Sequence, residues 1–156
     1  MKDIKNKYDQ LRKKYSLPKL EDLVKEFAIK LENPDLILHD TVCKINEEIS
    51  DCAKTLESII FVGSSGEPSD LYEANMLKDK KDKIFTFYKE LMSIVWKGRK
   101  ILTTANEKDM AQFINESYNN WIKNLKIYFI KICEILENKW KETSLRTETT
   151  EMMYHG

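Results

Sequence analysis

Apolar residues recur along most of the chain at intervals of three and four, which is the spacing of one face of an α-helix. Pro18 interrupts this pattern, and proline is well suited to the first turn of a new helix. It predicts a short extra helix over residues 18–31, set at an angle to the first helix. The first helix is indicated by four positions: Ile4, Tyr8, Leu11 and Tyr15.

Asn33 and Pro34 predict the start of the next helix, by the same reasoning. The apolar positions of this segment alternate in steps of four and three without a slip. They form a narrow stripe, which is typical of a peripheral bundle helix or a coiled-coil seam. The stripe consists of Leu38, Val42, Ile45, Ile49, Cys52, Leu56 and Ile59.

A third long helix is predicted from Asp79, a plausible N-cap, to about Leu102. Its apolar positions cover an arc of about 220°, counted at 100° per residue, which is more than one neighbouring helix can cover. Gly98 lies inside this arc, and its missing side chain permits another helix to approach closely.

The last helix is predicted to begin at about Asn106 or Asp109 and to end at Glu142. At about 1.5 Å per residue it would exceed roughly 45 Å, so its far end must project or be covered by another element. The inward positions are Ile114, Tyr118, Trp121, Leu125, Tyr128, Ile132 and Ile135. We expect residues 143–156 to form a disordered tail, because they are polar and without period.

Residues 61–77 (FVGSSGEPSDLYEANML) interrupt the helical pattern with two glycines and a proline. The glycine spacing fits neither a phosphate-binding loop nor a nucleophile elbow. Asp70 and Glu73 have the spacing of a capping box, which predicts a short helix over residues 69–77. The alternative is that Asp70, Tyr72 and Glu73 surround the mouth of a ligand site.

These elements predict an all-α protein, an antiparallel four-helix-type bundle in one domain over residues 1–142. Apolar residues make up 42% of the chain and charged residues 33%, which suits a helical bundle. No apolar run exceeds four residues and the N-terminus lacks a signal sequence, so we expect a cytoplasmic protein without a membrane contact.

The chain offers few groups for metal or nucleophilic chemistry. Cys43, Cys52 and Cys133 lack the spacing of a zinc site and are expected to be reduced. His39 and His155 do not belong to the paired Glu-x-x-His elements of a di-metal bundle. We therefore expect no metal, no cofactor and no catalytic residue, and we lean against an enzyme.

Charge is distributed unevenly although the net charge is zero. Residues 31–75 carry two basic and ten acidic side chains, whereas residues 76–104 carry eight basic and three acidic ones. This alternation can fix the order of helices in a bundle. Alternatively, basic side chains form a phosphate-binding patch for nucleic acid. The candidates are Lys78, Lys80, Lys81, Lys83, Lys97, Arg99 and Lys100.

Two sets of apolar residues are candidates for an interaction surface. Phe85, Met92 and Trp96 edge the wide face of the third long helix. Ile127 and Ile130 point away from the inward face of the last helix. The alternative is that residues 18–31 cover both sets.

The stretch YDQLRKKYSLPKLEDLVKEFAI, residues 8–29, resembles the start of small archaeal helical proteins in which a KY-x-LP step precedes a short helix with an acidic start. The resemblance implies an all-helical fold and an archaeal source. It brings no catalytic residues to this chain.

The leading hypothesis is a non-enzymatic helical interaction module that acts as a homo-oligomer or as a subunit of an assembly. A nucleic-acid- or ribosome-associated protein that uses the lysines at 78–83 and 97–100 is the second hypothesis. A small-ligand binder or enzyme centred near residues 69–75 is the third.

Overall fold

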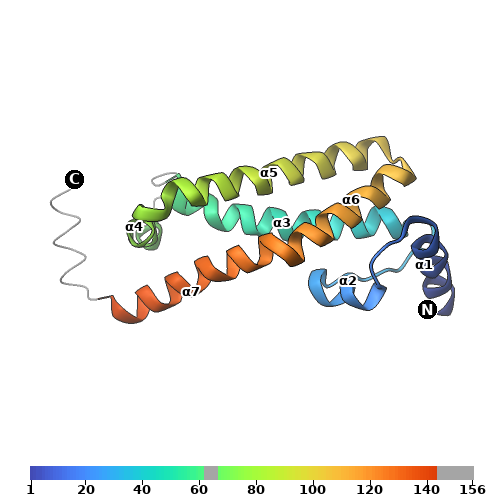
Figure 1. The fold of residues 1–156 in the computed structure, drawn as a ribbon, viewed down its shortest axis with the longest axis horizontal. Coiled ribbons are helices and arrows are strands. Elements are labelled where there is room, and N and C mark those ends of the chain that lie inside the picture. Colours follow the sequence, from blue (N-terminus) through green and yellow to red (C-terminus); the bar gives the residue numbers. More distant parts are fainter. Residues whose placement is uncertain (62–66, 144–156) are drawn as a thin grey trace.

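A computed structural model describes residues 1–61 and 67–143 of the chain (Figure 1). Every element in these two ranges is helical, which confirms the predicted all-α class. The elements are α1 (Lys2–Tyr15), α2 (Leu20–Phe27), α3 (Ile37–Ile60), α4 (Pro68–Met76), the 3-10 turn η1 (Lys78–Lys80), α5 (Lys81–Thr104), α6 (Glu107–Asn120), the π-helical turn η2 (Trp121–Leu125) and α7 (Lys126–Glu142).

Three long helical segments form the body of the described part: α3, α5 and the continuous run α6–η2–α7 (Figure 1). The chain reverses direction between them, as expected for an antiparallel bundle. Helices α1 and α2 lie at one end of the bundle, and α4 lies at the other end (Figure 1). The predicted short helices after Pro18 and near residues 69–77 are therefore both present, and each lies at an end of the bundle.

Two predicted helix starts can be compared with the structure. Asn106 occupies the N-cap of α6, and its side-chain oxygen accepts a hydrogen bond from the Asp109 backbone N–H at 3.0 Å. The start predicted at Asn33 comes too early. The Asn33 side chain instead accepts from the Asp35 backbone N–H at 2.9 Å, and this turn delays α3 until Ile37.

Two predicted caps are wrong. Asp79 lies inside the turn η1, and α5 begins two residues later at Lys81. Asp70 is not an N-cap, because α4 already begins at Pro68, the residue type preferred in a first helical turn. Asp70 then lies in the first turn of α4, where the helix dipole favours an acidic side chain.

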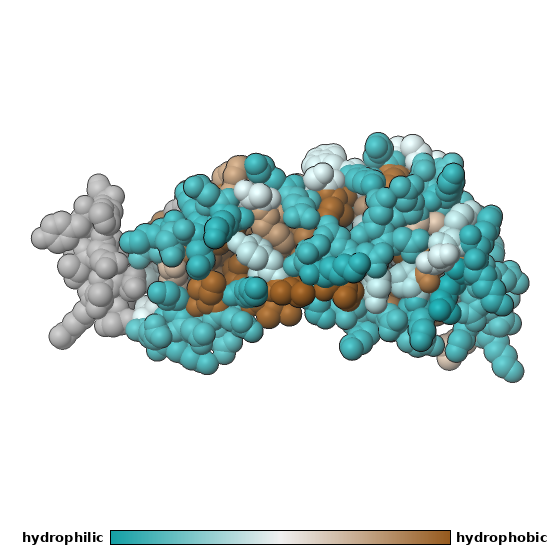
Figure 2. Space-filling view, viewed as in Figure 1, coloured by the Kyte–Doolittle hydropathy of each residue, from teal (hydrophilic) through white to brown (hydrophobic). Residues whose placement is uncertain are grey.

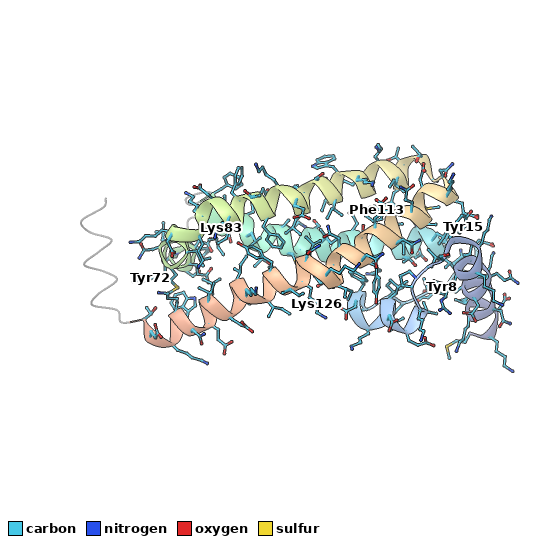
Figure 3. All side chains as sticks on the ribbon, viewed as in Figure 1. Tyr8, Tyr15, Tyr72, Lys83, Phe113 and Lys126 are labelled. Atoms are coloured by element: carbon cyan, nitrogen blue, oxygen red, sulfur yellow. The ribbon has the colours of Figure 1, made fainter. Side chains whose placement is uncertain are left out.

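A close approach of helices occurs at Gly98 on α5, as the sequence predicts. A Cβ atom there would lie 2.5 Å from Asn46 Oδ1 on α3 and 3.0 Å from Phe113 Cζ on α6. Asn46 also donates a hydrogen bond to the Val95 carbonyl at 3.2 Å. Gly98 thus lets all three long segments meet at one point, and Figure 3 labels Phe113 there.

Tyrosine hydroxyls attach α1 to the rest of the fold (Figure 3). The buried Tyr8 donates to the Pro18 carbonyl at 2.6 Å, which holds the turn before α2. Tyr15 donates to Glu107 at the start of α6, also at 2.6 Å. This hydrogen bond, followed by that from Lys14, lowers the pKa of the Glu107 carboxyl. The N-terminal helices are therefore anchored to the bundle by specific polar contacts.

None of the helices in the described ranges is long and apolar enough to span a membrane. The glycine-rich residues 63–66 and, apart from Thr143, the predicted tail 143–156 lie outside the described residues.

Candidate functional site

Helix α7 is apolar on nearly all sides over residues 127–136, yet it is poorly covered. A helix that is apolar all round is normally buried. Of the residues of α7, all of which the structure describes, Ile132 is the one that is fully buried, and Tyr128, Phe129, Ile135 and Leu136 pack partly against the core. The apolar residues of this stretch are Ile127, Tyr128, Phe129, Ile130, Ile132, Cys133, Ile135 and Leu136.

The start of α7 is anchored to α2. Glu26 on α2 accepts hydrogen bonds from Lys126 Nζ at 2.7 Å and from Trp121 Nε1 at 3.1 Å. The hydrogen bond from Lys126 is the main cause that lowers the pKa of Glu26, whose side chain is 9% exposed. The Phe27 ring packs against Trp121 with centroids 5.6 Å apart. Figure 3 shows Lys126 beside α2.

The far end of α7 is held by α4. The rings of Tyr72 and Trp140 pack with centroids 5.8 Å apart, and Trp140 Nε1 donates to Glu73 at 3.3 Å. Between these two anchors α7 diverges from α5 (Figure 1). The long helix is thus fixed at its ends while its middle is left partly uncovered.

The π-helical turn η2 lies where α7 begins to diverge. The backbone N–H of Lys126 bonds to the carbonyl of Trp121, five residues earlier, instead of four. Such turns insert one residue into a helix and occur often at functional sites. Trp121 and Leu125 both face the core, as does Ser117 one turn earlier, because residues four apart share one face of a helix.

An open groove of about 690 Å³ runs between α5 and the segment η2–α7. Its apolar floor contains Phe87 and Tyr128, whose rings meet edge to face with centroids 4.7 Å apart. On each wall the lining residues recur every four positions over two helical turns. The charged lining residues are Asp82, Lys83, Glu90, Lys123 and Lys131.

Exposed isoleucines adjoin this groove. Ile127, which lines it, is 47% exposed, and Ile130 on the outer face of α7 is 44% exposed. Figure 2 shows apolar residues in a strip along the middle of this side of the molecule, between two hydrophilic rims. Of the sequence candidates, Ile127 and Ile130 therefore lie beside a groove, and Lys83 lies on its opposite wall.

The predicted apolar surface on α5, formed by Phe85, Met92 and Trp96, is unevenly exposed. Phe85 is 39% exposed and Trp96 is 61% exposed, whereas Met92 packs partly against the core. The alternative in which residues 18–31 cover this edge does not hold, because α2 packs on α3 and on Trp121 instead. Cations cover the exposed rings: Lys89 lies 5.3 Å from the Phe85 centroid, and Arg99 lies 4.6 Å from that of Trp96.

The basic candidates do not form one patch. Lys78, Lys80, Lys81 and Lys83 lie around the start of α5, and the other three lie near its end, about 20 Å away at 1.5 Å per residue. Lys97 is paired with Glu116 at 2.7 Å, and Arg99 packs on Trp96. A nucleic acid that contacted both groups would have to span this distance along α5.

The three residues of the candidate ligand mouth do not lie together either. Tyr72 and Glu73 face Trp140 on α7, so these two side chains hold helices together. Asp70 lies earlier, in the first turn of α4. The three side chains are therefore placed mainly by the contact between α4 and α7.

The cysteines are free thiols in different surroundings. Cys52 is buried on α3, and burial raises its pKa to about 12. Desolvation raises the pKa of the half-buried Cys43 as well, and partial desolvation by neighbouring side chains raises that of Cys133, although this residue is exposed. In the two described ranges, no group of three or more His, Cys, Asp or Glu side chains is placed to hold a metal ion.

Of the residues that line the groove, only Lys83 and Ile127 were sequence candidates; among those missed are its floor, Phe87 and Tyr128, and two rim residues, Lys123 and Lys131. Tyr128 was expected only as an inward position of the last helix. A usable signal was the all-round apolar character of residues 127–136, which exceeds what a bundle of this size covers.

Comparison of the chain with protein-family models, with curated proteins and with solved structures gives no match. The interpretation of the site rests on its own chemistry.

Proposed function

We propose that this protein is a helical interaction module that binds another α-helix along α7 and the adjoining groove. One observation carries the proposal: residues 127–136 are apolar around the helix, and Ile132 alone among all the described residues of α7 is buried. Water contact with this surface is unfavourable, at about 25 cal/mol for each Å² of apolar area. A docked partner would remove that contact.

The shape of the groove favours a helix as the occupant. Its walls are two helical segments whose lining residues repeat every four positions, such as Asp82, Thr86 and Glu90 on α5. A helix packs into such a space by placing its ridges between those of its neighbours, at about 8–10 Å between axes. The apolar floor with a charged rim matches the general form of grooves that receive amphipathic helices.

Photo-crosslinking tests this proposal. Ile130 is replaced by p-benzoylphenylalanine in the full chain, and the cells that contain it are irradiated. We expect a discrete adduct, because a docked helix would lie against this position. The matched control is the same replacement of Val24, which is 44% exposed on α2 and lies away from the groove.

The adduct at position 130 should disappear when Ile127→Asp is added, because a buried carboxylate would oppose docking. Absence of an adduct at position 130, or equal adducts at positions 130 and 24, would contradict the proposed function.

A further inference from the structure

We infer that the helix which docks on α7 is α7 of a second copy of this chain, in antiparallel orientation. This inference rests on the proposed function and names its partner. It starts from the outward stripe of the continuous segment η2–α7, on the face opposite Ile132; this set is called the α7 stripe. In chain order the stripe consists of Lys123, Ile127, Ile130, Glu134 and Glu137, all of them exposed.

The order of charges along this stripe is the central observation. A cation precedes the two isoleucines, and two carboxylates follow them. A two-fold axis that passes near the middle of the stripe reverses this order in the second copy. Lys123 then faces Glu134 of the second copy, and Ile127 faces Ile130.

An interface between identical chains about a two-fold axis must be complementary to itself, because both copies present the same surface. The α7 stripe meets this condition twice, once for each symmetry-related Lys123–Glu134 pair. A parallel pairing would instead place Lys123 against Lys123 and Glu134 against Glu134. The charge pattern therefore favours the antiparallel arrangement.

The other exposed apolar surface provides a contrast. On α5 the flanking charges of Phe85 and Trp96 are Lys89 and Arg99, both basic. A parallel two-fold pairing of that surface would bring these cations together. Those cations also already cover the aromatic rings. The exposed isoleucines of α7, in contrast, are flanked by charges of both signs.

The groove fits the same arrangement. Lys123 and Ile127 of the stripe also line the groove, so a second α7 on this stripe would cover part of the groove edge. Helix α7 has 17 residues, or about 25 Å, which is enough length for such a contact. The net charge of zero adds no long-range repulsion between two copies.

Analytical ultracentrifugation of the full chain tests the inference. At low ionic strength we expect a concentration-dependent species at twice the 18.5 kDa mass of one chain. Lys123→Glu and Glu134→Lys, each alone, should weaken self-association about tenfold or more, because each reverses two symmetry-related contacts. Both side chains are exposed, so circular dichroism should show that each variant is folded.

Mixing the two variants is the decisive measurement. In a mixed dimer, the carboxylate introduced by Lys123→Glu in one copy faces the ammonium introduced by Glu134→Lys in the other. The second contact joins the unchanged Glu134 of the first copy to the unchanged Lys123 of the second, so both contacts are attractive. The affinity of the wild-type dimer should return in the mixture, and also in the double variant K123E/E134K. Lys89→Glu on α5 is the matched control and should leave self-association unchanged.

A wild-type chain that stays monomeric at high concentration would overturn the inference. So would a dimer whose affinity is unchanged by Lys123→Glu and Glu134→Lys, or a mixture of these two variants that does not regain the wild-type affinity. Crosslinking at position 130 separates the two proposals. An adduct with a different protein, together with a monomeric chain, contradicts the second copy but supports helix docking. The lack of any adduct contradicts both proposals.

Discussion

Helices α3 and α7 both carry about half of their residues as apolar side chains, but they bury them differently. Helix α3 buries twelve residues, from Ile37 to Ile60, between its neighbours. Helix α7 buries Ile132 alone among its residues, all of them described. The difference follows from pattern: the apolar residues of α3 occupy one stripe, whereas those of α7 surround the helix.

This contrast shows how an unfilled interface differs from an ordinary exposed side chain. Single exposed apolar residues are common on protein surfaces and need no partner. On α7 the exposed Ile127 and Ile130 belong to a continuous apolar segment beside a groove. The surplus of apolar surface lies where the neighbouring helices are too few to surround α7, and this is the place where a docked helix would complete the packing.

The largest effect is expected in α3. Ile45→Ala should lower the free energy of unfolding by about 2–5 kcal/mol, because the side chain is fully buried and a cavity would remain. Urea denaturation followed by circular dichroism measures this change. A loss under about 1 kcal/mol would contradict the close packing that distinguishes α3 from α7.

Gly98→Ala tests the contact through which α3 meets α5. The added methyl group would fall 2.5 Å from Asn46 Oδ1, so we expect a loss of about 1–3 kcal/mol in unfolding free energy. Asn46→Ala provides the matched background, since it removes the two nearest obstructing atoms and leaves Phe113 Cζ, at 3.0 Å. Differential scanning calorimetry of the single and double variants should show the cost of Gly98→Ala largely disappear in that background.

Glu26→Gln tests the anchor at the start of α7. The variant should lose about 1 kcal/mol of stability at neutral pH, because Lys126 and Trp121 would lose a charged acceptor. The pKa of Glu26 is lowered by folding, so its contribution is fully present above the unfolded value of 4.5. It is lost as the pH falls below that value and through the folded pKa.

The difference between wild type and Glu26→Gln should accordingly shrink as the pH is lowered below about 4.5 in chemical denaturation series. Glu21→Gln is the control, because Glu21 is exposed and lies 3.9 Å from its partner Lys5. It should change stability by less than about 0.5 kcal/mol. A difference that persists unchanged at pH values well below 4.5 would contradict the role of the Glu26 carboxylate.

The smallest effect is expected on the outer face of α7. Ile130→Ala should change the free energy of unfolding by less than about 0.5 kcal/mol at concentrations where the chain is monomeric. Ile132→Ala, two residues away and buried, should cost about 2–4 kcal/mol. Equal losses in urea titrations of the two variants would mean that a single chain covers both faces of α7.

Local patterns in the sequence were sufficient to predict the helices. The spacing of apolar residues located α3, α5 and the long C-terminal run, and Asn106 marked the start of α6. Errors occurred where a second local choice competed. Asn33 formed a turn with Asp35, and Pro68 began α4 before Asp70 could act as a cap.

The candidate surface was predictable in part. The exposure of Ile127 and Ile130 follows from which face of the last helix points inward, and the spacing of apolar residues within that one helix indicates this face. Phe87 and Tyr128 could not be assigned to a groove, because that requires the distance between two helices. The π-helical turn η2 could not be predicted either, because nothing in the sequence WIKNL indicates a hydrogen bond from a backbone N–H to the carbonyl five residues earlier.

The sequence by itself determined that the described residues are helical, about where the long helices lie, and which side of each helix is apolar. These properties depend on neighbours within a few residues along the chain. The tertiary structure decided which apolar surfaces are covered. Anchors from Glu26 and Tyr72 hold the two ends of α7, and its middle diverges from α5. Burial depends on contacts between segments that are distant in sequence, and periodicity carries no information about those distances.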